Sequence, residues 1–276
     1  MKTITRSLGL LVWLAMTTVH AQVPAPLPPF TVYGKAANWS GRAFSSNDAA
    51  AVVAKINGVE MDRCQVVSGI YPELNYRVHI PMASAPTPGR GVVGDPLTFE
   101  VYYDGTMHTV MNGTSNPVVG ETATALQCNL IVGTDSAGDG LPDEYKQLLL
   151  PYYIAAGWGT DLSDILPEHD FDGDDYSNYQ EFLAGTIPVD GSDYPRIHDI
   201  FPAGSNSVGV AFLAAPGRTY TLPRSDNLVS NQWTDAELSL SSNVPPNRTF
   251  YGSEKDQIVT LYLFPTNQAA FRLDVR

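Results

Sequence analysis

The chain has 276 residues and a formal net charge of −13, because 29 acidic side chains outnumber 16 basic ones. Such a balance repels nucleic acid phosphates and no basic stripe offsets it, so we exclude nucleic acid as a partner. The excess charge lies in residues 135–193, which hold fourteen Asp or Glu and a single base, Lys146. Acids and bases cancel in the remainder of the chain.

The first 21 residues have the pattern of a secretory signal peptide. Lys2 and Arg6 make the start basic, residues 8–16 are apolar but too few to span a bilayer, and Ala21 is small. This pattern predicts a secreted protein, extracellular or at the cell surface, and the alternative is an uncleaved anchor helix. No later stretch is apolar enough to cross a membrane.

Residues 22–29 form a Pro-rich segment, and short runs of β-forming residues follow over residues 30–132. Two of these runs end at dipeptides typical of tight hairpins, Asn57-Gly58 and Asp104-Gly105. We therefore predict an antiparallel β-sandwich over residues 30–132. Its expected strands are 51–56, 76–80, 97–103 and 107–110.

The N-terminal domain holds both cysteines of the chain, Cys64 and Cys128. In an exported protein a disulfide between them is the expected state, and closing a loop of this length stabilises a domain by roughly 4 kcal/mol. The alternative is two buried thiols. Neither state is catalytic, because the sequence has no C-x-x-C motif.

Residues 135–146, which we call loop 1, read Asp-Ser-Ala-Gly-Asp-Gly-Leu-Pro-Asp-Glu-Tyr-Lys. In the calcium loop of an EF-hand, oxygens come from positions 1, 3, 5, 7, 9 and 12, and position 6 is Gly. Loop 1 has Gly140 at position 6, but Ala137 at position 3 and Lys146 at position 12 provide no ligand. Its candidate ligands are Asp135, Asp139, Asp143 and, at position 7, Leu141.

Loop 1 therefore has two interpretations. It holds a second calcium ion if other acids complete the shell through the fold, and the candidates are Glu144, Asp161, Asp164 and Glu168. Otherwise it is a Gly-rich turn into a helix, with Pro142 just inside the helix start. Residues 146–158 then form an apolar helical run, bent or broken at Pro151, that packs the loops together.

Residues 170–181, which we call loop 2, read Asp-Phe-Asp-Gly-Asp-Asp-Tyr-Ser-Asn-Tyr-Gln-Glu. A hard divalent cation needs six to eight oxygens at once, and this loop has an oxygen at every ligand position. Position 6 is Asp175, which tolerates the required positive φ less well than Gly, so we expect a weaker calcium site. The candidate ligands are the side chains of Asp170, Asp172, Asp174, Asn178 and Glu181, and the carbonyl of Tyr176.

The residues after loop 2 predict one short helix. Ser177 and Gln180 match a capping box, and Gly185 followed by Pro188 is a helix stop. Loop and helix thus form one unit, which favours a metal loop over the alternative of an acidic, solvated turn.

The segments "DSAGDGLPDEY" and "DFDGDDYSNYQEFLAGTIP" resemble the calcium-binding D-x-D-G-D-G repeats of thrombospondin type 3 and dockerin-like modules in large secreted bacterial proteins. The resemblance covers residues 133–190, about a fifth of the chain. It does not extend to Ala137 or Lys146. The ligands that it implies are Asp170, Asp172, Asp174, Asn178 and Glu181 in loop 2, and Asp135, Asp139 and Asp143 in loop 1.

Residues 194–276 return to β-like runs and predict a second, smaller β-sandwich. Residues 217–233 and 271–273 resemble a terminal module that follows such calcium repeats in bacterial surface and secreted proteins, and this resemblance implies no chemistry. The expected strands are 208–212, 218–222, 236–240, 258–264 and 270–275.

The sequence thus predicts a mainly β fold with a small α insert, in which a calcium-binding loop–helix–loop–helix connector at 133–193 joins two antiparallel β-sandwiches. No hydrolase or phosphate-binding motif is present, so we expect a non-catalytic protein. The expected function is that of a secreted structural or adhesive module in which Ca²⁺ rigidifies the connector. The alternatives are a dockerin-like module that binds another secreted protein and a carbohydrate-binding or carbohydrate-active accessory protein.

Overall fold

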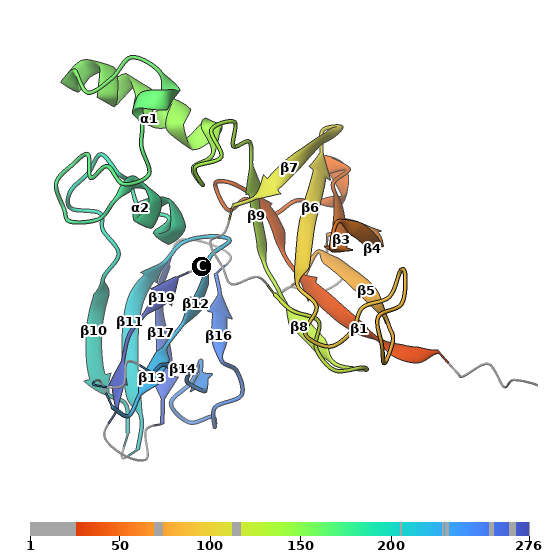
Figure 1. Cartoon of the computed structure of the whole chain (residues 1–276). Helices are drawn as coiled ribbons and strands as arrows, with labels where there is room; N and C mark the ends of the chain where they lie inside the picture. The colour runs from red at the N-terminus through yellow and green to blue at the C-terminus, as the bar shows by residue number, and fades with distance from the viewer. Residues whose placement is uncertain are drawn as a thin grey trace, which may run out of the picture.

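The protein is described by a computed structural model over residues 26–68, 74–111, 117–204, 206–227, 229, 232–253, 257–264 and 269–275. The signal-peptide prediction falls on residues 1–21 and lies outside the described residues. Over these residues the fold is mainly β with two α-helices, as the sequence predicts. In Figure 1 the two β domains lie side by side, and the helices are inserted between them along the chain.

Two sheets that share one apolar core form the N-terminal domain. The three-stranded sheet has the order β5-β1-β8, and the six-stranded sheet has the order β2-β9-β7-β6-β3-β4. A single 3₁₀ turn, Ser46–Asp48, lies before β3. The strands are β1 (Leu27–Gly34), β2 (Ala36–Asn38), β3 (Ala51–Ile56), β4 (Val59–Gln65), β5 (Tyr76–Met82), β6 (Leu97–Tyr103), β7 (Thr106–Val110), β8 (Ala125–Gln127) and β9 (Leu130–Gly133).

The two hairpin dipeptides form the turns that the sequence predicts. Asn57 and Gly58 have φ values of 50° and 78°, and Asp104 and Gly105 have φ values of 50° and 72°. Two consecutive left-handed residues are the requirement of a type I′ turn, which matches the twist of antiparallel strands. These turns join β3 to β4 and β6 to β7.

Two strand pairs of this domain are parallel, whereas the sequence predicted an antiparallel sandwich. β1 pairs with β8, and β2 pairs with β9, in parallel register. A parallel pair needs a long connection, and here the connection is nearly the whole domain. The first two strands of the domain therefore lie beside the last two, and the domain is closed by its own ends.

Cys64 and Cys128 are both free thiols, so the expected disulfide is not formed in this structure. Both pack against the edge of the N-terminal core. Burial raises the pKa of both thiols, that of Cys128 to about 11, which keeps them protonated and poorly reactive. The carbonyl of Cys128 accepts a hydrogen bond from the buried Tyr76 hydroxyl at 2.5 Å.

The connector contains α1 (Asp143–Ala156), a 3₁₀ turn at Leu162–Asp164 and α2 (Asn178–Ala184). α1 continues through Pro151, where the sequence predicted a bend or break. Proline removes one helical hydrogen bond, that to the carbonyl of Gln147. Gln147 and Pro151 both lie on the exposed side of α1, so water can satisfy that carbonyl.

A second core lies in the C-terminal domain, between a four-stranded sheet and a broken second layer. The four-stranded sheet has the order β10-β11-β17-β15, and the second layer consists of two three-stranded sheets, β16-β12-β19 and β14-β13-β18. Its strands are β10 (Ile197–Pro202), β11 (Val208–Ala214), β12 (Thr219–Thr221), β13 (Pro223–Ser225), β14 (Thr234–Asp235), β15 (Leu238–Ser239), β16 (Phe250–Gly252), β17 (Gln257–Leu263), β18 (Ala270–Phe271) and β19 (Asp274–Val275).

Candidate metal centre

Loops 1 and 2 have the same backbone hydrogen bonds, displaced by 35 residues. In each loop the carboxylate at position 1, Asp135 or Asp170, accepts three backbone N–H groups over 2.7–3.2 Å. The carboxylate at position 5, Asp139 or Asp174, accepts the N–H two residues further on, at 3.0 and 2.9 Å. The two segments that resemble calcium repeats therefore adopt one backbone conformation.

Position 6 has a positive φ in both loops, as the sequence predicts. The φ of Gly140 is 89° and that of Asp175 is 74°. Behind loop 2 the predicted capping box is present, because the Ser177 hydroxyl accepts from the Gln180 N–H and the Gln180 side chain accepts from the Ser177 N–H. Gly185, with a φ of 80°, ends α2 in the left-handed conformation.

Loop 2 gathers oxygens that have no hydrogen-bond donor. Asp170, Asp172 and Asp174 each offer a carboxylate oxygen, and the three oxygens lie within 4.8 Å of one another. Buried oxygens are expected to be hydrogen-bonded, so each exception calls for an explanation. In loop 2 the buried oxygens that accept no hydrogen bond are both oxygens of Asp172, Oδ2 of Asp174, Oδ1 of Asn178 and Oε2 of Glu181. All five belong to side chains that the sequence predicted as ligands.

Asn178 and Glu181 lie at the start of α2 and are both 0% exposed. The Asn178 amide donates to the Tyr153 hydroxyl and to the Leu166 carbonyl, both at 2.8 Å, which leaves Oδ1 as an acceptor. Glu181 Oε1 accepts from the Thr186 hydroxyl at 3.2 Å, which leaves Oε2. Tyr153 and Thr186 thus position two candidate ligands, and neither has a spacing in the sequence that would have revealed this role.

The electrostatics of loop 2 favour a cation. Burial, followed by the negative charges of Asp172 and Asp174, raises the pKa of Glu181 to about 8. Burial and the neighbouring Asp174 and Asp170 also raise the pKa of Asp172. These carboxylates resist ionisation because they repel one another and lack water, and a bound cation removes both causes.

The residues of loop 2 fit a calcium ion. All donors are oxygens of carboxylates, an amide or a backbone carbonyl, the ligands that hard cations prefer. Ca²⁺ takes six to eight such oxygens in irregular geometry, whereas Mg²⁺ keeps several waters and demands an octahedron. Asp170, Asp172, Asp174, Tyr176, Asn178 and Glu181 together supply that number.

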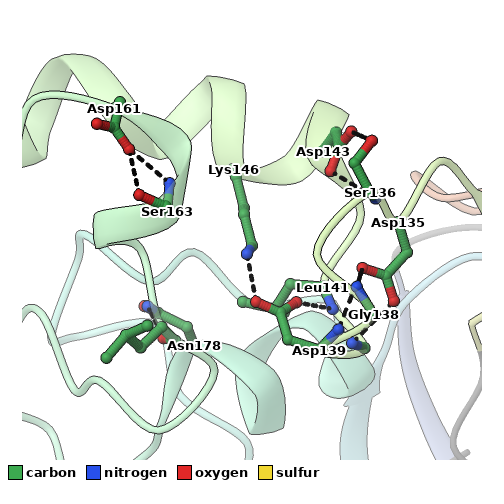
Figure 2. A network of polar contacts seen from close by, with 12 residues as sticks. Asp135, Ser136, Gly138, Asp139, Leu141, Asp143, Lys146, Asp161, Ser163 and Asn178 are labelled. Carbon is green, nitrogen blue, oxygen red and sulfur yellow. Dashed lines mark hydrogen bonds and ion pairs between the residues drawn. The ribbon is translucent and has the colours of Figure 1, made fainter.

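Loop 1 has the same backbone but a different charge partner. Lys146, at position 12, is 1% exposed, and its ammonium forms an ion pair with Oδ2 of Asp139. Figure 2 shows this side chain reaching from α1 to the loop. Both oxygens of Asp143 accept from Ser136, one from the backbone N–H at 3.2 Å and one from the hydroxyl at 2.6 Å. The carboxylates of loop 1 are thus satisfied by the protein itself.

Three of the acids proposed to complete loop 1 serve local turns instead. Glu144 accepts from the backbone N–H and the hydroxyl of Thr134. Asp161 and Asp164 form the capping box of the 3₁₀ turn between the helices. Asp161 lies away from loop 1 in Figure 2. The sequence therefore identified the position of loop 1 but missed the role of Lys146, which is the only base in residues 135–193.

A series of contacts between aromatic rings runs through the connector from one β domain to the other. Trp39, which follows β2, lies with its ring centroid 6.3 Å from that of Tyr145 on α1, and Tyr145 lies 5.2 Å from Phe182 on α2. The guanidinium of Arg218, from the C-terminal domain, lies 5.2 Å from the Phe182 centroid. Arg218 also donates to the carbonyls of Leu183 and Phe182, at 2.9 and 2.5 Å, and so caps the end of α2.

The two β domains also touch each other directly. Asn129 donates from its side chain to the Thr219 hydroxyl at 3.0 Å. The backbones of Gly41 and Gly217 approach so closely that a Cβ on Gly41 would lie 2.1 Å from the carbonyl oxygen of Pro216. The two β domains are therefore held together both by the connector and by direct contacts between them.

Comparison with models of protein families, with curated proteins and with solved structures finds no match to this chain. Among the described residues, neither helix combines the length and the apolar character that a membrane crossing requires.

Proposed function

We propose that this chain is a secreted, calcium-binding structural protein in which an ion in loop 2 rigidifies the connector between two β domains. The observation that carries the proposal is the set of five buried oxygens on Asp172, Asp174, Asn178 and Glu181 that accept no hydrogen bond. A divalent cation gives all of them a partner at once. The resemblance to thrombospondin type 3 and dockerin-like repeats, stated above from the sequence, supports the same function.

Few residues separate the proposed ion site in loop 2 from the contacts that α2 makes to the C-terminal domain. Glu181 closes the ligand shell, and the next two residues present the carbonyls that hold Arg218 of the C-terminal domain. Phe182 packs with Tyr145, which in turn meets Trp39 of the N-terminal domain. An ion that fixes Glu181 therefore fixes the first turn of α2, and with it the contacts that α2 makes to both sides.

Binding energy appears as stability of the connector, because the metal binds the folded loop and not the unfolded chain. At a free calcium concentration of 100 times Kd the gain is about 2.7 kcal/mol. Extracellular calcium modules have Kd values of about 10⁻⁴ to 10⁻³ M, and we expect loop 2 to bind in that weak range because Asp175 is left-handed.

Calcium titration of the purified protein by calorimetry tests the proposal. We expect uptake of one ion at millimolar calcium and a thermal transition of the connector that moves to lower temperature in chelator. Asp172→Asn should abolish both effects. Asp104→Asn, in an exposed left-handed turn of the N-terminal domain, changes the same charge and should alter neither. Absence of uptake at millimolar calcium, with identical melting in chelator, contradicts the proposal.

A further inference from the structure

The side chain at position 12 carries opposite charges in the two loops. Lys146 and Glu181 are separated by 35 residues, lie in the first turn of their helices and are 1% and 0% exposed. Each donates its backbone N–H to the residue four positions earlier, at 3.0 and 2.9 Å. In loop 2 this position is a carboxylate without a full set of partners, and in loop 1 it is an ammonium paired with Asp139.

We infer that the Lys146 ammonium is the built-in cation of loop 1, taking the place that a metal ion takes in loop 2. Loop 1 is then closed at every calcium concentration and binds no metal. The assignment of the ion position rests on the proposed function of loop 2. The assignment of Lys146 as the charge partner of loop 1 does not, because the ion pair and its burial are properties of loop 1 alone.

The two departures of loop 1 from the calcium pattern complement each other. Ala137 at position 3 removes a carboxylate, and Lys146 at position 12 replaces a second carboxylate with a positive charge. Fewer negative charges then need a smaller positive charge, and one ammonium supplies it. Loop 2 carries Asp172 and Glu181 at the same two positions, and there a divalent ion is required to balance the charge.

Burial makes the ion pair necessary for Lys146. A lysine is almost never fully buried unless it is paired, because a desolvated ammonium costs several kcal/mol. None of the oxygens of Asp135, Asp139 or Asp143 is among the buried oxygens that lack a hydrogen bond in the described part of the chain. The alternative is that Lys146 contributes through the burial of its aliphatic stem and not through its charge.

Substitution of Lys146 by methionine separates these roles, because methionine keeps the apolar stem and removes the charge. In calcium-free buffer we expect Lys146→Met to lower the Tm of the connector by roughly 5–10 °C, because the Asp139 carboxylate, whose side chain is 24% exposed, loses its charge partner. The matched control is Lys55→Met, which removes the ion pair with Glu100 in the N-terminal sheet, where the lysine side chain is 22% exposed. A shift for Lys146→Met no larger than that of the control overturns the inference.

A reciprocal gain of function completes the test. The double variant Ala137→Asp, Lys146→Glu restores both ligand positions, so calcium uptake should rise from one ion to two in calorimetric titration of the full chain. Uptake of two ions by the unsubstituted protein, or of only one by a folded double variant, overturns the inference. If the unsubstituted protein takes up no calcium at all, the proposed function of loop 2 fails, and the Lys146→Met comparison still decides the role of Lys146.

Discussion

Loop 1 and loop 2 share their backbone hydrogen bonds and differ in the charge that balances their carboxylates. In loop 1 the partners are Lys146 and Ser136, and the candidate oxygens are satisfied by the protein itself. In loop 2 the corresponding helix begins with Asn178 and Glu181, each of which has one side-chain oxygen without a donor, Oδ1 and Oε2 respectively. We infer from this comparison that one backbone can be closed by an internal cation or by an external one, and that the choice depends on the residue at position 3 and on the charge of the side chain at position 12.

Exchange of that side chain should have the largest effect. Glu181→Lys transfers the arrangement of loop 1 to loop 2, so we expect complete loss of calcium uptake and a melting temperature that no longer responds to chelator. In calcium-free buffer this variant should be more stable than Glu181→Gln, because only the lysine neutralises Asp174. Calorimetry and thermal melting of both variants measure these effects. Retained calcium uptake in Glu181→Lys would break the comparison.

The next effect concerns the attachment of α2 to the C-terminal domain, which loop 1 lacks. Arg218 is 4% exposed and donates to two carbonyls at the end of α2. We expect Arg218→Met to lower the free energy of unfolding by about 2–4 kcal/mol, because the helix end loses charged donors. Calcium should still bind to this variant. It should then stabilise the connector but no longer the C-terminal domain. Amide hydrogen exchange with and without calcium measures the protection of each region. If calcium protects the C-terminal domain of Arg218→Met as much as that of the unsubstituted protein, the coupling through Arg218 is contradicted.

A third effect is the response of calcium-free loop 2 to pH. The pKa of Glu181 is about 8 in the folded protein against an ordinary value of 4.5, so the folded state binds more protons between these values. The stability of the connector therefore falls as pH rises from about 4.5 to about 8. Melting in calcium-free buffer at pH 5 and pH 8 checks the sign. Glu181→Gln should remove most of the difference, and an equal dependence in that variant would assign it elsewhere.

The smallest effects concern position 6. Asp175 adopts a left-handed φ of 74°, where glycine has no steric cost, so Asp175→Gly should stabilise the connector by about 0.5 kcal/mol. Gly140→Ala should destabilise it by about 1–2 kcal/mol, because φ is 89° and the new Cβ would lie 3.2 Å from the Tyr179 ring. Urea unfolding of both variants measures the pair. If both substitutions changed the free energy of unfolding in the same direction, position 6 would not be under the same backbone constraint in the two loops.

The sequence predicted correctly those turns and helix ends that depend only on residues close together in the chain. The turns at Asn57-Gly58 and Asp104-Gly105 need left-handed residues, and β3 and β6 beside them occupy the predicted ranges 51–56 and 97–103. The capping box of Ser177 with Gln180 and the stop at Gly185 are equally local, and both are present.

Features that depend on distant residues were missed or misjudged. The parallel pairs β1–β8 and β2–β9 join the ends of the N-terminal domain, and no short pattern in either strand reveals its partner. The expected disulfide followed from counting cysteines, whereas the structure keeps Cys64 and Cys128 as thiols. Arg218 lies 37 residues beyond Glu181, so its role at the end of α2 has no signature in loop 2.

The pairing of β2 with β9 joins the start of the N-terminal domain to its end. β2 ends at Asn38 and pairs with residues 130–132 of β9, so the chain must close a loop of about 90 residues before this sheet is complete. β9 leads directly into loop 1, and the Lys146 ammonium arrives with the first turn of α1. We therefore expect loop 1 to be complete once the first domain has folded, whereas loop 2 should need a cation from solution.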